Sequence, residues 1–244
     1  WDDANNQDGI RPDSIKVQLY ANDKKAGDEV TLTAADNWTY TWSDLDEKSA
    51  GQTIVYTVKE VGKVDGYKVA IGDLDQGNVT ITNTHTPAEI SIKGSKTWKD
   101  AKNQDGIRPD EVVINLLADG VATGQTATVS KASDWSYEFK NLPKYKGGKE
   151  IVYSVTEDAV DGYTTTIDGY DVTNTHKPST TKVVGKKTWD DADNKDKLRP
   201  ESITVRLYAN GKEVQHVVVT AKDKWSYSFE NLPEYENGKK IEYS

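Results

Sequence analysis

The sequence predicts an all-β protein made of tandem antiparallel β-sandwiches with about seven short strands each. Apolar and polar residues alternate with a period of two in short runs rich in Val, Ile, Thr, Tyr and Trp. Turn-forming Gly, Pro, Asn and Asp clusters separate these runs at intervals of about ten residues. A related motif also begins three times, at Trp1, Trp98 and Trp189.

The spacing of these motifs, 97 and then 91 residues, predicts domain-sized repeats. It exceeds the roughly 20 to 50 residues of solenoid units, so we expect each repeat to bury its own core. The predicted domains are residues 1–87, lacking a first strand, a complete repeat at 88–178, and residues 179–244, lacking the last strands. Short proline-containing junctions, HTPAEI and HKPSTT, predict stiff links that keep the repeats in an extended line.

The middle repeat shows the predicted strands in order. A first strand carries Ile90, Ile92, Gly94 and Lys96 on one face, because alternate residues of a strand share a face. The strands that follow are EVVINLLA, WSYEFKNL, IVYSVTE, YTTTI and YDVTN. No segment keeps a helical apolar spacing over three turns, so an α-helical domain is excluded.

Composition excludes several classes of function. The chain has 31 basic and 40 acidic residues, a net charge of −9, and its basic residues are scattered, so a nucleic-acid partner is not expected. Without cysteine or methionine it has no disulfides and no thiolate chemistry. No apolar run approaches the roughly 20 residues of a membrane span, and no signal peptide precedes Trp1. We expect any targeting and anchoring segments to lie outside these residues.

The acidic loop that opens each repeat, WDDANNQDGIRP in the first, resembles a calcium-binding loop only partly. If Gly9 takes the glycine position of an EF-hand, the first ligand position falls on Ala4. The later copies have Ala101 and Ala192 there, and the third has Lys197 in place of the glycine. We therefore predict a polar connecting loop and no metal site.

Three kinds of polar residue fall at the ends of core-facing rows: Lys96 and Lys187, Glu60 and Glu157, and Asn83 and Asn174. Isolated buried charges and amides are destabilising by several kcal/mol, so we expect the lysine, acid and amide of one repeat to meet. An ordinary ion pair with a hydrogen-bonded amide, or solvated strand ends, are the alternatives. Lys93 and Lys186 are nearby but lie off the inward row.

Several motifs, KTW, RPDEVVINLLADG, WSYEFKNLPKY, VTEDAVDGY and VTNTH, resemble the Cna B-type domain of Gram-positive collagen adhesins, related surface proteins and pilins. The resemblance covers essentially the whole chain and implies an inverse immunoglobulin-like sandwich. It also implies an intramolecular isopeptide bond between a first-strand lysine and a last-strand asparagine, promoted by a glutamate.

Carried over to this sequence, the resemblance implies a bond between Lys96 and Asn174 with Glu157 as the proton shuttle. The first repeat has Glu60 and Asn83, and its lysine would precede Trp1. The third has Lys187, and its acid and amide would follow Ser244.

The chemistry of such a bond depends on burial. An apolar pocket disfavours the charged ammonium form of Lys96, and a neutral amine is a nucleophile. In the same pocket Glu157 is expected to stay protonated, donate to the Asn174 oxygen, and shuttle protons while ammonia leaves. Because the reaction occurs once per domain, the protein is not expected to be an enzyme, and no cofactor is needed.

Other residues have simpler interpretations. The repeated positions of Trp135 and Trp225 favour packing over a sugar-binding platform. His85 and His176 lack a second ligand cluster, so a metal role is not expected. No hydrolase motif is present.

The predicted function is a structural stalk in an adhesin anchored to a bacterial cell wall. A host matrix or cell-surface ligand would be bound by a separate head domain. The alternative is that the repeats themselves bind a host extracellular protein, which predicts a large exposed apolar patch. At the incomplete repeats, strand pairing between copies is a further expectation.

Overall fold

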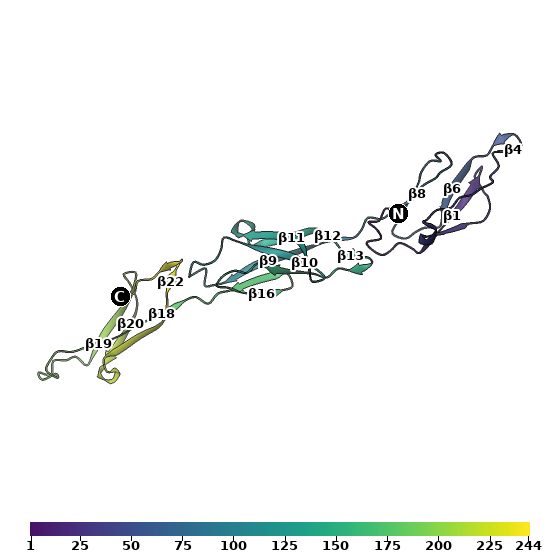
Figure 1. The fold of residues 1–244 in the computed structure, drawn as a ribbon. Helices are drawn as coiled ribbons and strands as arrows, with labels where there is room; N and C mark the ends of the chain where they lie inside the picture. Colours follow the sequence, from purple (N-terminus) through teal and green to yellow (C-terminus); the bar gives the residue numbers. More distant parts are fainter. The chain divides into compact units, whose positions relative to one another are not determined.

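The computed structural model describes residues 1–244, and nearly every regular element is a β-strand (Figure 1). The exceptions are three one-turn 3-10 helices, η1 (Ala34–Asp36), η2 (Lys131–Ser133) and η3 (Ala221–Asp223). None of them has the length and apolar character needed to cross a bilayer. The predicted all-β fold is confirmed.

The chain forms two compact units, residues 1–91 with 139–152 and residues 92–138 with 153–244. Within these units part of one succession of elements recurs three times. Each Arg-Pro pair, for example, is followed by a long strand: β1 (Ser14–Ala21), β10 (Glu111–Ala118) and β19 (Ser202–Ala209). The division into domains 1–87, 88–178 and 179–244 stays a prediction from the repeated sequence.

The first unit is built around β1, which pairs with β2, β3 and β6. Its buried core includes Val17 and Leu19 of β1, Leu32 of β3, and Tyr67. The other strands form three separate pairs, β4–β5, β7–β8 and β13–β14. The bounds are β2 (Lys24–Lys25), β3 (Val30–Thr33), β4 (Lys48–Ser49), β5 (Gln52–Thr53), β6 (Tyr56–Val61), β7 (Lys68–Ile71), β8 (Ile81–Thr84), β13 (Tyr145–Lys146) and β14 (Lys149–Glu150).

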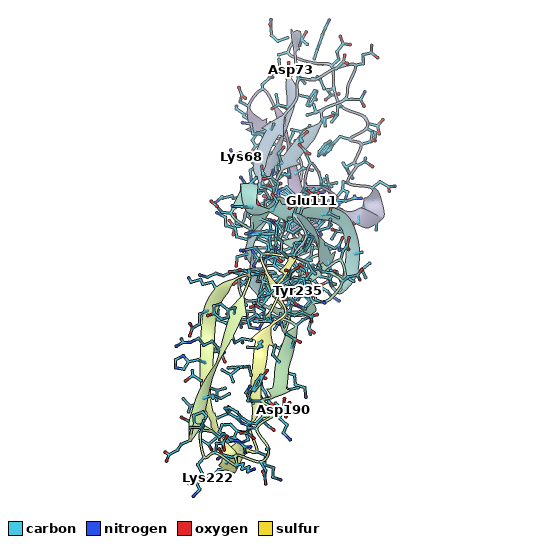
Figure 2. All side chains as sticks on the ribbon, turned by 90° about the vertical axis from the view of Figure 1, so that its left-hand side faces the viewer. Lys68, Asp73, Glu111, Asp190, Lys222 and Tyr235 are labelled. Carbon is cyan, nitrogen blue, oxygen red and sulfur yellow. The ribbon has the colours of Figure 1, made fainter.

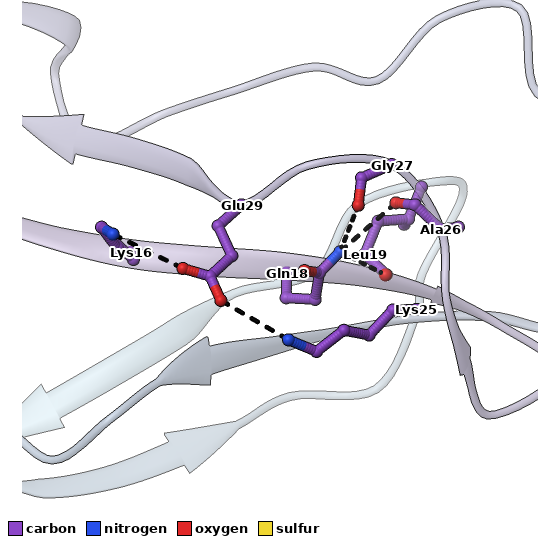
Figure 3. A network of polar contacts seen from close by, with 7 residues as sticks. All are labelled: Lys16, Gln18, Leu19, Lys25, Ala26, Gly27 and Glu29. Carbon is purple, nitrogen blue, oxygen red and sulfur yellow. Dashed lines mark hydrogen bonds and ion pairs between the residues drawn. The ribbon is translucent and has the colours of Figure 1, made fainter.

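A buried glutamine holds the turn between β1 and β3. The Nε2 atom of Gln18 donates to the carbonyl oxygens of Leu19, Ala26 and Gly27 at 2.9, 3.3 and 3.2 Å (Figure 3). Nearby, Glu29 lies 3.5 Å from the Nζ atoms of both Lys16 and Lys25. The side-chain amide thus ties Leu19 of β1 to Ala26 and Gly27 in the segment that leads to β3.

The middle repeat is a sandwich of two sheets, one of three strands in the order β11-β10-β15 and one of four in the order β12-β9-β17-β16. This strand number agrees with the prediction. Ile114 and Leu116 from β10 and Val172 from β17 are fully buried in its core. The bounds are β9 (Glu89–Lys99), β11 (Val121–Ser130), β12 (Ser136–Pro143), β15 (Tyr153–Glu157), β16 (Thr164–Asp168) and β17 (Asp171–Thr175).

One strand pair of this sandwich departs from the predicted antiparallel pattern. β9 and β17 run parallel, with Lys96 opposite Val172 and Asn174 opposite Trp98. They are the first and last strands of the repeat, and parallel neighbours need a long connection, here supplied by the intervening strands. The chain therefore enters the repeat at one end of the β9–β17 pair and leaves it at the other end.

The remaining strands form three pairs, β18–β21, β19–β20 and β22–β23. Leu207, Phe229 and Leu232 make their small core, with Tyr243 packed against it. The bounds are β18 (Thr180–Lys186), β20 (Lys212–Thr220), β21 (Ser226–Pro233), β22 (Tyr235–Glu236) and β23 (Lys239–Lys240).

Polar side chains cover the ribbon along its length (Figure 2). The labelled Lys68, Asp73, Asp190 and Lys222 are all exposed. Side chains of both charges thus project into solvent from the first and third repeats, in keeping with the acidic but mixed composition.

Candidate crosslink site

The site in the middle repeat is built from the two sheets of the sandwich. Lys96 comes from β9, Glu157 ends β15, and Asn174 lies in β17. The side chains of Lys96 and Glu157 are both 0% exposed, and Asn174 is also fully buried. The alternation of each strand places these polar groups inward, as the sequence predicted.

The amine and the acid are in direct contact. Lys96 Nζ lies 2.5 Å from Glu157 Oε1, but the angles at these two atoms do not fit a hydrogen bond. Burial disfavours the charged form of Lys96 and lowers its pKa. The contact with Glu157 favours the charged form but only partly offsets this effect. Nζ also lies 4.5 Å from the centre of the Trp98 ring. The amine is thus dry and biased toward its neutral form.

A threonine that sequence reasoning missed connects the acid to the amide. The hydroxyl of Thr165, on β16, lies 3.0 Å from Glu157 Oε2 and 2.8 Å from Asn174 Oδ1. The expected direct hydrogen bond from Glu157 to the Asn174 oxygen is replaced by this bridge. The Nδ2 atom of Asn174 has no hydrogen-bond partner. The lysine thus contacts the acid, and the threonine connects the acid to the buried amide.

The first repeat brings its acid and amide together without a lysine. Asn83, on β8, is 3% exposed, and its Nδ2 atom donates to Oε2 of Glu60 at 2.7 Å. Its Oδ1 atom has no partner. Beside it a groove of about 540 Å³ opens onto core residues including Trp1 and Val17. The corresponding face of the middle repeat is covered by β9.

In the third repeat, the sequence places Lys187 on the apolar face of its strand. Lys187 is exposed, although its Nζ lies 4.8 Å from the ring centre of Trp189, much as Lys96 lies over Trp98. β18 ends at Lys186, whereas β9 continues to Lys99. β18 pairs with β21 alone, whereas β9 pairs with both β12 and β17.

The acidic loops have a structural role that the sequence analysis also missed. Both carboxylate oxygens of Asp100 accept from Arg108, at 2.6 and 2.9 Å, and Oδ2 also accepts from the Tyr163 hydroxyl at 2.8 Å. Burial opposes ionisation of Asp100, but these bonds outweigh it and lower its pKa to about 2. This carboxylate thus ties the start of the loop to its Arg-Pro end and to Tyr163.

The same arrangement recurs in the other repeats. Asp3 pairs with Arg11 and Asp191 with Arg199, each at 2.6 Å. In every copy an Asn follows the Asp by three residues and an Arg follows it by eight. This constant spacing is the sequence pattern from which the network could have been predicted.

The tryptophans pack together, as predicted from their repeated positions. Edge-to-face pairs join Trp1 to Trp38, Trp98 to Trp135, and Trp189 to Trp225, with ring centres 5.1, 5.3 and 5.1 Å apart. Such geometry is the favoured one for aromatic pairs in a protein interior.

Comparison with known proteins agrees with this architecture. The Cna protein B-type domain matches residues 1–84, 92–175 and 183–244. The chain belongs to the Cna B-type domain family. The collagen adhesin of Staphylococcus aureus is 45% identical over the whole of this chain, which spans 21% of the length of that relative.

A solved structure shares the Cna B-type fold over the same length. Two B repeat units of the collagen binding protein of Staphylococcus aureus superpose with a TM-score of 0.70 at 44% sequence identity. That match covers 100% of this chain and 65% of the other.

Proposed function

We propose that this chain is part of the stalk of a cell-surface adhesin, and that its middle repeat is closed by an isopeptide bond between Lys96 and Asn174. The observation that carries the proposal is the contact of a fully buried lysine with Glu157, beside a buried asparagine whose Nδ2 atom is unpaired. Such groups are expensive to bury as separate charges, and a reaction that removes them relieves that penalty.

The chemistry balances without a co-reactant. Burial lowers the pKa of Lys96. The proposed reaction begins with transfer of the ammonium proton to Glu157, which leaves an uncharged amine. The amine nitrogen attacks Cγ of Asn174, a new N–C bond forms, and the bond from Cγ to Nδ2 breaks. Nδ2 leaves as ammonia with the proton that the amine loses, and Glu157 carries it between the nitrogens. Folding replaces a bimolecular reaction with an intramolecular one.

The parallel pairing of β9 and β17 gives the bond a mechanical consequence. Force that enters at the start of β9 and leaves at the end of β17 would pass from Lys96 to Asn174 through covalent bonds. The residues between them would carry no load. A bond across these 78 positions also constrains the unfolded chain, by about 4.5 kcal/mol on the loop-entropy relation used for disulfides.

The wider setting follows from the family. A collagen adhesin is a surface protein, so we propose an extracellular location on a bacterial cell wall, in a parent protein that binds a host matrix ligand through another domain. The repeated, mixed-charge surface of these domains fits a spacer. The crosslinking is a single self-modification and not catalytic turnover.

Intact-mass measurement of the full 244-residue chain tests the crosslink. The proposal expects a mass about 17 Da below that of the sequence, the loss of one ammonia. Lys96→Ala, Glu157→Ala and Asn174→Ala should each restore the full mass. Lys187→Ala is the matched control and should keep the deficit, because Lys187 is exposed. A wild-type chain at the full sequence mass would refute the bond.

A further inference from the structure

The register of one strand pair directs the Thr165 hydroxyl at the amide. β16 pairs antiparallel with β17, and Thr165 lies directly opposite Asn174. Residues opposite each other in an antiparallel pair project from the same face. Thr165 Oγ1 therefore reaches both Asn174 Oδ1, at 2.8 Å, and Glu157 Oε2, at 3.0 Å.

The proton count at this hydroxyl limits how the three groups can bond. A hydroxyl has a single proton, so it cannot donate to both oxygens at once. All three are satisfied when the Glu157 carboxyl donates to Thr165 Oγ1 and Oγ1 donates to Asn174 Oδ1. An ionised Glu157 would compete with the amide oxygen for that proton. The bridge thus suits a protonated acid and polarises the amide carbonyl.

The first repeat provides an internal comparison. Val69 occupies the register position of Thr165, opposite Asn83. Without a hydroxyl there, the amide is turned the other way: Nδ2 of Asn83 donates directly to Glu60 at 2.7 Å, and Oδ1 has no partner. In the middle repeat the amide oxygen is the bonded atom and the nitrogen is unpaired. The two repeats thus differ both in the hydroxyl opposite the asparagine and in the orientation of the asparagine amide.

We propose that Thr165 is a positioning residue for crosslinking, which holds the Asn174 carboxamide with its oxygen toward the acid proton and its nitrogen free to leave. The inference rests on the proposed bond between Lys96 and Asn174. As the amine attacks Cγ, negative charge develops on Oδ1 and strengthens the bond from Oγ1. When the carbonyl re-forms and ammonia departs, Thr165 and Glu157 each hold the proton with which they began.

The proposal predicts a rate effect that depends on the hydroxyl alone. Thr165→Val removes the hydroxyl and keeps the branched shape that favours a strand. We expect crosslinking to slow on the order of a hundredfold, as when one preorganised donor to a developing oxyanion is lost. Thr165→Ser restores the hydroxyl without the methyl group and should react within a few-fold of the wild-type rate.

The experiment follows the ammonia deficit of the full chain over time after cell-free synthesis, by intact mass. Thr166→Val makes the same chemical change one residue along β16, at an exposed position paired with Thr173, and is the matched control. The proposal expects a slow valine variant at position 165, with the serine variant and the control near the wild-type rate. Hydrogen exchange of β10 amides checks that each variant folds.

The outcomes separate this proposal from the crosslink itself. If the wild type loses ammonia and Thr165→Val does so equally fast, the positioning role is wrong and the bond stands. Equal slowing by valine and serine would show that the hydroxyl does not account for the effect, and would also overturn the role. A wild type that never loses ammonia would overturn both proposals.

Discussion

The middle and third repeats place a lysine in almost the same local setting, but only one of the two is buried. Lys96 and Lys187 both precede Thr-Trp, and each backbone amide donates to a tryptophan carbonyl, of Trp135 and Trp225 respectively. The Lys96 side chain is 0% exposed, whereas Lys187 is exposed. The difference lies in the strands that face the lysine.

This difference shows that burial at the site is set by tertiary structure. The first strand fixes which way the lysine points, and β15 and β17 supply the acid, the amide and the cover. A lysine on the strand alone stays solvated and unreactive. The variants below test this distinction between strand and partners, beginning with the largest expected effect.

The largest effect should come from Lys96→Ala, which prevents the proposed bond. We expect the free energy of unfolding of the middle repeat to fall by about 4.5 kcal/mol, the loop-entropy contribution of the closed segment. Native-state hydrogen exchange of β10 amides measures this repeat separately from its neighbours.

Lys187→Ala is the control for this change. It should alter exchange of β19 amides by no more than about 0.5 kcal/mol, as expected for an exposed site. Similar losses at the two positions would mean that the lysine stabilises the strand itself, and not through its partners.

A second contrast concerns the acidic loops. Asp100→Ala should destabilise the middle repeat by about 3 kcal/mol, because it leaves both Arg108 and the half-buried Tyr163 hydroxyl without their partner. Asp191→Ala should have a clearly smaller effect, since the Asp191 side chain is 28% exposed against 1% for Asp100. Denaturant-dependent hydrogen exchange gives both values, and an equal effect would contradict the role given to burial.

The acid stability of the middle repeat should reflect the same loop. The pKa of Asp100 is about 2 in the folded protein, below its usual 3.8. A depressed pKa adds stability above pH 3.8, and this contribution is lost as the pH falls toward 2. Tryptophan fluorescence during acid titration should show wild-type unfolding in that range. Asp100→Asn should flatten this dependence, and an unchanged profile would contradict the assignment.

The smallest expected effect involves the histidines that follow the last strands. His176 Nδ1 lies 2.8 Å from the Gly162 carbonyl oxygen and Nε2 lies 3.0 Å from Asp105 Oδ2, so both nitrogens face acceptors. The bond to Asp105 raises the pKa of His176 above 6.5. Its contribution is therefore complete below pH 6.5 and lost as the pH rises through the folded pKa.

An NMR titration of the His176 ring measures this pKa directly. Asp105→Asn should return it toward 6.5, while the analogous pair in the first repeat, His85 with Asp8, should keep a raised pKa. Asp105 Oδ2 also accepts from the Ser179 amide at 2.8 Å, so the pair fixes the chain just beyond the repeat. If the pKa of His176 in the wild type is not raised, the pair with Asp105 does not have this role.

Much of the fold followed from sequence because its signals are local. The period of two in EVVINLLA and its neighbours predicted strands, and the inward rows placed Lys96, Glu157 and Asn174 in the core. Alternation gives the face of a strand but not its neighbours. The parallel pairing of β9 with β17 could therefore not be predicted from the pattern.

The missing parts of the site depend on register and on distant partners. Thr165 is one of three consecutive threonines, and only the pairing with Asn174 distinguishes it. The loop network needed Tyr163, 63 residues from Asp100, to explain a buried carboxylate.

The most direct test of the account is peptide mapping of the purified full chain by tandem mass spectrometry. The account predicts one branched peptide in which the Lys96 segment is joined to the Asn174 segment, about 17 Da lighter than the sum of the two. Recovery of the two segments as separate, unmodified peptides in a folded chain would contradict it.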